Sequence, residues 1–180
     1  PKNRLPIETS IFMPDAREHI YTKLEAEIDA GRQAFVVCPM IEEGEKSLGR
    51  ELSVGTVAKH ISGWLPGKRV VVLHGKMKSD EKEAIMVRFK ERQIDILVST
   101  TVIEVGVDVP NATVMVIEGA DRFGLAQLHQ LRGRIGRGEH AGRCILVTTA
   151  NEPPTKRLRV IEHEYDGFKL ADYDLELRGP

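Results

Sequence analysis

Two of the three arginines in the stretch LAQLHQLRGRIGRGEH, residues 125–140, stand among its three glycines. Arg134 and Arg137 lie three residues apart, among Gly133, Gly136 and Gly138. A guanidinium binds phosphate through two parallel hydrogen bonds and keeps its charge, so this pair predicts an anion site. Glycine weakens a helix by roughly 1 kcal/mol relative to alanine, so the three glycines indicate that a ligand or a neighbouring domain comes close to the backbone.

Helical spacing gives this stretch two faces. The apolar face contains Leu125, Leu128, Leu131 and Ile135, and the polar face contains Gln127, Gln130, Arg134 and Arg137. A helix extending through residue 137 would direct two amides and two guanidinium groups at one oxyanion. The alternative is a solvated basic helix end whose arginines satisfy its own carbonyls. The amides and glycines on the same face favour the anion site.

Further candidates follow two apolar runs. They are His74 after RVVVL, Thr100 and Thr101 after DILV and Ser99, and Gly106 and Asp108 in the segment that follows these threonines. Each also has a purely structural interpretation. His74 could be an ordinary surface histidine, Thr101 could form a capping box with the glutamate three residues later, and Asp108 could form a turn.

Five short apolar runs rich in valine and isoleucine alternate with amphipathic segments. Residues 34–38, 69–73, 95–98, 113–117 and 144–148 predict strands buried on both faces of a parallel sheet. Helices are predicted after Asp15, which starts a capping-box pattern and is followed by Gly31 at the expected end, after Ser79, and more weakly around Gly55. The fold class is therefore α/β, with a mostly parallel sheet covered by helices.

Ligands in such sheets bind at the carboxyl ends of the strands. This rule places His74, the two threonines and the arginine stretch at one edge. Residues 151–157 (NEPPTKR) mark a boundary, so we expect one domain over residues 1–150 and a small helical annex over 151–180.

The composition is that of a globular protein without a basic excess. Net charge is −1 for 180 residues, of which 41% are hydrophobic. The two cysteines, Cys38 and Cys144, lie in apolar runs, which favours reduced thiols in the cytoplasm. No apolar stretch reaches membrane-spanning length, and no membrane partner or metal site is indicated. The chain begins at Pro1 without a methionine, which suggests an excised piece of a longer protein.

Three strings resemble motifs of superfamily-2 helicases. QLRGRIGR resembles motif VI, ILVSTTVIEVGVDVP resembles motif V, and VVVLHGKM resembles the motif that opens the second crossover of the second motor domain. GADRFGLAQLHQLRGRIGRG with GFKLADYDLELRGP is similar, more specifically, to RecG-type ATP-dependent DNA helicases, which remodel branched DNA and stalled replication forks. The resemblance covers nearly the whole chain, and transcription-repair coupling translocases share most of it.

This resemblance implies a RecA-like second motor domain that shares an ATP site with a missing first motor domain. It implies that Arg134 and Arg137 supply charge to the γ-phosphate, with Gln130 assisting, and that Gly106 and Asp108 line the nucleotide. It implies DNA contacts for Thr100, Thr101 and His74. Residues 151–180 would then begin a translocation hairpin, and a separate N-terminal wedge domain would select forked or branched DNA.

The phosphate-binding loop and the acidic box of a complete helicase are absent from the sequence. No G-x-x-x-x-G-K-[ST] string occurs, and no D-E-x-H or D-E-x-D box follows a strand. The Mg²⁺ ligands would therefore lie in the first motor domain, and we expect this chain alone not to hydrolyse ATP. A nucleic-acid or protein interaction module built on a helicase-like fold is the alternative of a different class.

Overall fold

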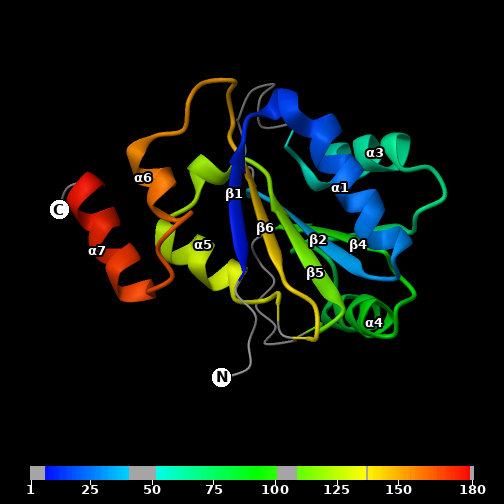
Figure 1. Ribbon diagram of the computed structural model, residues 1–180. Coiled ribbons are helices and arrows are strands. Elements are labelled where there is room, and N and C mark those ends of the chain that lie inside the picture. The colour runs from blue at the N-terminus through cyan, green and yellow to red at the C-terminus, as the bar shows by residue number, and fades with distance from the viewer. Residues whose placement is uncertain (1–6, 41–51, 101–108, 137, 179–180) are drawn as a thin grey trace.

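The computed structural model describes residues 7–40, 52–100, 109–136 and 138–178, and Figure 1 shows their arrangement. Six strands form one sheet in the order β1-β6-β5-β2-β4-β3, and every neighbouring pair is parallel. The strands are β1 (Glu8–Phe12), β2 (Gln33–Cys38), β3 (Val70–Leu73), β4 (Ile96–Thr100), β5 (Ala112–Ile117) and β6 (Arg143–Val147). The predicted α/β class with a parallel sheet is confirmed.

Helices cover both faces of this sheet (Figure 1). The described helices are α1 (Arg17–Asp29), α3 (Val54–Trp64), α4 (Ser79–Lys90), α5 (Leu125–Arg132), α6 (Lys156–Val160) and α7 (Gly167–Arg178), with short 3-10 turns at Pro14–Ala16 and Ala120–Arg122. Because side chains alternate along β2, Ala34 and Val36 pack with α1 and α3, whereas Phe35 and Val37 pack with α4 and α5. The two resulting cores hold the strands in fixed register.

Strand β1 was not among the predicted strands. It pairs with β6 from Glu8 opposite Arg143 to Phe12 opposite Val147. Only Thr9 is buried among its five residues, because β1 lies at the edge of the sheet. A half-exposed edge strand has no continuous apolar run, which is the signal that identified the other five.

Two predicted helix starts need correction. Asp15 lies in a 3-10 turn, and its backbone N–H donates to the side chain of Asn151, 2.9 Å away, so it is not the cap of α1. Ser79 is the first residue of α4, and Lys78 occupies the cap position. The end of α1 immediately before Gly31 agrees with the prediction.

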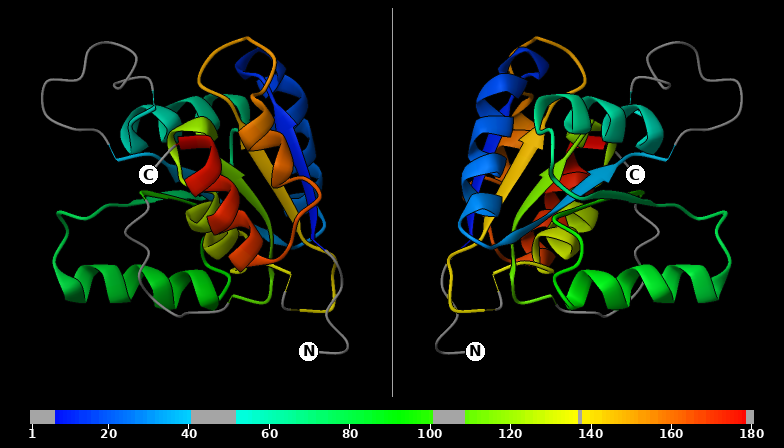
Figure 2. Two further views of the ribbon diagram at one scale, coloured as in Figure 1. Left: turned by 90° about the vertical axis from the view of Figure 1, so that its left-hand side faces the viewer. Right: turned by 90° about the vertical axis from the view of Figure 1, so that its right-hand side faces the viewer.

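Helices α6 and α7 follow β6 and pack beside α5 (Figure 2). Leu158 of α6 and Leu170 of α7 are buried in the same core as Leu128 of α5. The predicted helical character of residues after 150 is therefore confirmed for α6 and α7. Among the described residues, no helix is long and apolar enough to cross a membrane.

Candidate functional site

Helix α5 ends earlier than its sequence spacing indicates. Gly133 caps it, and the Gly133 N–H donates to the His129 carbonyl at 3.1 Å. The amide of Arg134 then donates to the Leu131 carbonyl at 3.0 Å. The predicted continuation of the helix through Arg134 is therefore wrong, because glycine ends the helix and the arginine lies in the turn that follows.

We call residues 133–136 and 138 the arginine turn. Ile135 is fully buried and anchors this turn in the core, whereas Arg134 is half-buried. Gln130 is exposed on the last turn of α5, at the same end of the helix. The structure thus brings Gln130 and Arg134 to one end of α5, and Arg137 lies outside the described residues.

Two glycines of the arginine turn lie against the entries to other strands. Gly136 has a φ of +72°, and a Cβ added there would lie 3.0 Å from Cγ1 of Ile7. A Cβ on Gly138 would lie 2.7 Å from the carbonyl oxygen of Pro110, closer than real Cβ atoms approach. The close approach that the glycines predicted is therefore made, at these two positions, by strand entries of the same chain.

The arginine turn lies at the amino-terminal edge of the sheet. Ile7 and Pro110, which touch its glycines, come just before β1 and β5. Helix α5 begins near the opposite edge, where the Thr149 N–H after β6 donates to Asp121 just before α5 at 2.7 Å (Figure 1). The expectation that this stretch lies at the carboxyl ends of the strands is therefore wrong for Arg134, because α5 crosses the sheet and the turn that follows it lies at the other edge.

The segment entering β5 ends in a tight turn beside the arginine turn. The Ala112 N–H donates to the Val109 carbonyl at 2.9 Å, which places Pro110 and Asn111 at the two central positions. The candidates Gly106 and Asp108 precede this turn and lie outside the described residues. The described end of their segment nevertheless contacts the arginine turn through Pro110 and Gly138.

His74 and Thr100 lie at the carboxyl-terminal edge, as predicted. Leu73, the last residue of β3, pairs with Ser99 in β4, so His74 and Thr100 come next on neighbouring strands. Both are half-buried, and the neighbouring Ser99 hydroxyl is buried without a hydrogen-bond partner among the described residues. Thr101 lies outside the described residues. The described candidates therefore separate into two groups at opposite edges of the sheet, Gln130 with Arg134 and His74 with Thr100.

Arg132 is a buried arginine that the sequence analysis did not single out. It is 2% exposed and donates to the carbonyls of Ile161 at 2.7 Å and Glu164 at 2.8 Å. Its guanidinium lies 4.3 Å from the centre of the Tyr165 ring. Position 132 comes four residues after Leu128, so helical spacing already places it on the apolar face of α5.

Arg132 determines the protonation state of the neighbouring His129. Nδ1 of His129 lies 3.2 Å from Nη2 of Arg132, and arginine can only donate, so Nδ1 accepts and the ring is neutral. Burial, and then the charge of Arg132, lowers the pKa of His129 below its ordinary value. Burial also lowers the pKa of Arg132, which still remains charged.

The other end of α5 is capped by a side chain of α7. Gly124 at the cap position has no side chain, and Oδ2 of Asp174 accepts from the Leu125 N–H at 2.6 Å. Oδ1 of Asp174 accepts from Arg157 at 2.8 Å, and Arg157 also donates to the Phe123 carbonyl. The helices after residue 150 therefore contact both ends of the helix that leads into the arginine turn.

Within the described part of the chain, no group of three or more histidine, cysteine, aspartate or glutamate side chains is placed to hold a metal ion.

Comparisons with known proteins identify relatives of the chain. A family described as the helicase conserved C-terminal domain matches residues 16–139. Over its full length the chain is 50% identical to ATP-dependent DNA helicase RecG of Synechocystis sp. and 49% identical to that of Bacillus subtilis, and it spans 22% and 26% of those proteins. A solved structure of RecG bound to a three-way DNA junction matches with a TM-score of 0.82 and 42% identity, covering the whole chain and 23% of RecG.

Proposed function

Because the chain belongs to the family of helicase conserved C-terminal domains, we propose that it is the second motor domain of a RecG-type ATP-dependent DNA helicase. The complete protein would remodel branched DNA and stalled replication forks. The similarity to RecG over the whole chain favours this family over the transcription-repair coupling translocases. One structural observation carries the mechanism, namely that the arginine turn and the His74–Thr100 pair lie at opposite edges of the sheet.

The amino-terminal edge would be half of the ATP site. Arg134 and Arg137 would each present a guanidinium to the γ-phosphate across a cleft shared with the first motor domain, with Gln130 at its border. The donor set of this edge fits a nucleotide, because half-buried Arg134 and exposed Gln130 lie at one end of α5. Gly106 and Asp108 would contact the nucleotide from the segment that ends at Pro110.

Hydrolysis of ATP needs charge stabilisation that this edge can supply. Charge on the transferred phosphoryl group spreads over its oxygens in the transition state, and a fixed guanidinium stabilises that charge without reorganisation. When bound, ATP with Mg²⁺ supplies the reacting phosphates, and the Mg²⁺ ligands and phosphate-binding loop would belong to the first motor domain.

The carboxyl-terminal edge would contact DNA. Thr100, Thr101 and His74 carry short polar groups suited to hydrogen bonds with phosphate oxygens, which hold nucleic acid without reading its sequence. A related RecG has been solved on a three-way DNA junction, which supports branched DNA as the substrate. Recognition of the branch would belong to an N-terminal wedge domain of the same protein.

Residues 151–180 would form the beginning of a translocation hairpin attached to a motor domain of residues 1–150. The contacts of Arg132 and Asp174 support a coupling between the two parts, because they join residues after 150 to both ends of α5. A displacement of the arginine turn on ATP hydrolysis would then be transmitted to the annex.

The central test replaces the two arginines in the full-length protein. We expect Arg134→Ala and Arg137→Ala each to lower kcat for ATP by roughly 10³–10⁵-fold, while forked-DNA affinity changes little. Lysine should restore little activity, because an ammonium cannot reproduce the planar fork. Steady-state ATPase and fluorescence-based DNA binding measure the two quantities.

Arg159→Ala is the matched control, because Arg159 is an exposed arginine on α6 away from the arginine turn. Its kcat should stay close to that of the unmodified protein. Near-normal turnover with strongly weakened DNA binding in Arg134→Ala would instead assign the arginine turn to a DNA surface. ATPase activity unaffected by either arginine would favour the alternative, an interaction module without hydrolysis.

A further inference from the structure

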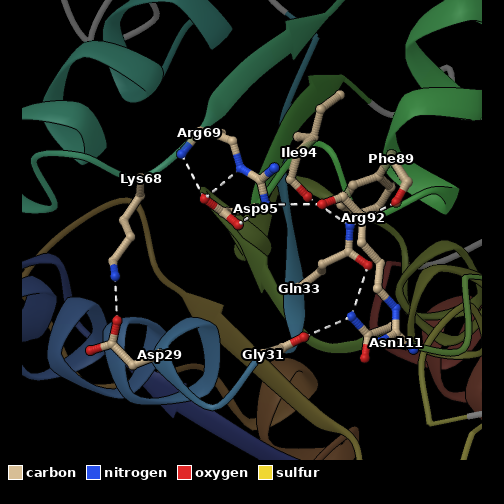
Figure 3. A network of polar contacts seen from close by, with 10 residues as sticks. All are labelled: Asp29, Gly31, Gln33, Lys68, Arg69, Phe89, Arg92, Ile94, Asp95 and Asn111. Atoms are coloured by element: carbon tan, nitrogen blue, oxygen red, sulfur yellow. Dashed lines mark hydrogen bonds and ion pairs between the residues drawn. The ribbon is translucent and has the colours of Figure 1, made fainter.

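Two side-chain amides join the entry of β5 to the amino-terminal edge of the sheet. Nδ2 of Asn111 donates to the carbonyl of Gly31 and to Oε1 of Gln33, both at 3.0 Å. The backbone N–H of Gln33 in turn donates to the carbonyl of Asn111 at 3.0 Å. Figure 3 shows the two side chains lying next to each other between the turns that they connect.

Gln33 is anchored in the core. It is 2% exposed, and its Nε2 donates to the carbonyls of Phe89 at 2.7 Å and Ile94 at 2.6 Å (Figure 3). Phe89 and Ile94 are both fully buried, and the Phe89 ring packs edge-on against Phe35. All four side-chain N–H groups of the Gln33–Asn111 pair are thus donated, which fixes the orientation of both amides.

The pair fixes the turn that contacts the arginine turn. Asn111 occupies a central position of the Val109–Ala112 turn, directly after Pro110. The Pro110 carbonyl lies so close to Gly138 that there is no room for a Cβ between them. A displacement of Pro110 by a few tenths of an ångström would therefore displace the arginine turn, since tightly packed atoms transmit such shifts.

The pairing of β2 with β5 is irregular at the same place. Gln33 pairs with Ala112, but Ala34 pairs with Val114, so the register skips Thr113. A bulge of this kind changes the direction in which a strand enters the sheet, and such bulges are common next to active sites. The regular backbone hydrogen bonds between β2 and β5 therefore do not by themselves fix the Pro110 turn. The side-chain amides of Gln33 and Asn111 provide the additional hydrogen bonds that fix it.

We propose that Gln33 and Asn111 are positioning residues for ATP hydrolysis. They hold Pro110 against Gly138 and so fix the position of the arginine turn, which would present Arg134 to the nucleotide. This inference rests on the proposed function, because it assigns the arginine turn to an ATP half-site. Neither amide touches the nucleotide.

The experiment measures ATP hydrolysis by the full-length protein with forked DNA, together with thermal unfolding. Asn111→Ala removes both donated hydrogen bonds. Asn111→Asp keeps the size of the side chain but places a carboxylate against two oxygen acceptors. For both variants we expect kcat to fall roughly tenfold to a hundredfold, the effect of misplacing reacting groups by about 1 Å, with KM for ATP changed less than threefold.

Thr113→Val is the matched control. Thr113 comes two residues after Asn111, inside β5, where it is buried and its hydroxyl donates to Oε2 of Glu27 at 2.8 Å. This variant loses a hydrogen bond of β5 but keeps the amide pair. We expect a decrease in Tm comparable with that of Asn111→Ala and a kcat within twofold of the unmodified protein.

The outcomes separate the positioning role from the proposed function. If Asn111→Ala and Asn111→Asp retain kcat while Arg134→Ala loses it, the ATP half-site stands and the positioning role is wrong. If all three β5 variants lose kcat in proportion to Tm, the amide pair only stabilises the fold and the positioning role is again wrong. If Arg134→Ala itself retains turnover, the proposed function fails. If kcat falls only in the Asn111 and Arg134 variants, the result supports both the positioning role of the amide pair and the proposed function.

Discussion

At the scale of single residues, the buried Arg132 is held by other residues of the same chain. Its Nη1 and Nη2 reach two carbonyls that no helix or strand satisfies, and its plane covers the Tyr165 ring. A buried guanidinium is costly unless its N–H groups are paired, and here backbone oxygens pair them without a carboxylate. QLRGRIGR therefore contains a buried structural arginine beside the half-buried Arg134.

Replacing Arg132 should destabilise the protein. Arg132→Leu keeps an apolar stem but leaves the carbonyls of Ile161 and Glu164 unpaired, at about 1–3 kcal/mol for each buried group. The free energy of unfolding, measured by denaturant titration, should fall by that order. Arg159→Leu, on the exposed side of α6, should change it by about 0.5 kcal/mol or less. Equal effects of the two variants would contradict the structural role of Arg132.

His129 predicts a pH dependence of stability. Its pKa is lowered in the folded protein, mainly by burial and next by Arg132, whereas Asp166 acts in the opposite direction. The unfolded chain therefore binds the proton more readily, so stability is lost as pH falls below about 6.5 and through the lowered pKa. Melting temperatures between pH 7.5 and 5.5 should fall less for His129→Gln than for the unmodified protein. Identical pH profiles would show that His129 does not contribute.

At the scale of elements, the strands could be predicted wherever both faces are buried. Residues 34–38 and 114–117 are apolar throughout because helices cover both sides of the sheet, so β2 and β5 appear in the sequence as continuous runs. Strand β1 gives no such signal, since its place is determined by pairing with β6. The local sequence pattern around β1 cannot predict that Glu8 pairs with Arg143, because the two residues are far apart in the chain.

The candidate site could be predicted by residue type but not by position. The motif strings named the arginines, threonines and His74 as candidates, and the rule on strand ends placed them all at one edge, whereas Arg134 lies at the edge opposite His74 and Thr100. The glycines predicted a close approach at the end of the helix, and Gly133 is the residue that caps α5. Gln33 and Asn111 were missed because their partners are backbone carbonyls, which have no counterpart in a pattern of side-chain types.

The proposed DNA contacts at the carboxyl ends of β3 and β4 predict that ATP hydrolysis by variants there responds less to DNA. Thr100→Ala and His74→Ala in the full-length protein should reduce DNA-stimulated ATPase more than basal ATPase, because these residues lie at the edge opposite the arginine turn. Each lost phosphate contact should also decrease the slope of log affinity against log salt by about 0.7 to 0.9. Full stimulation by forked DNA in both variants would leave His74 and Thr100 with structural roles only.

At the scale of the whole molecule, the sheet separates the arginine turn from the His74–Thr100 pair. Helix α5 runs from the edge of the sheet near Asp121 to the edge near Pro110. Residues that are close together in one motif string therefore contact different parts of the molecule. Arg132 faces the annex and Arg134 follows in the arginine turn. A connection between an ATP site at the arginine turn and the annex would therefore need no more than helix α5.

The isolated chain should not hydrolyse ATP. Under the proposed function it would supply arginines that stabilise transferred charge, but its sequence contains neither the phosphate-binding loop nor the acidic box. Phosphate release by the purified chain, with and without forked DNA, should equal the rate of a protein-free blank. Addition of a separately produced first motor domain should restore some activity. Turnover by the chain alone at the rate of a complete helicase would contradict the half-site.

The place of β1 beside β6 has a consequence for protein synthesis. The ribosome makes β1 before the other described strands, but the strand to which it hydrogen-bonds is the last of the sheet to emerge. While the middle of the sheet assembles from β2, β4 and β5, the β1 segment has no neighbour in the nascent chain. Strand β1 can join the sheet only after β6 has paired with β5, because β6 lies between β1 and β5. Ile7, which lies against Gly136 of the arginine turn, directly precedes β1, so this contact forms only when β1 pairs with β6.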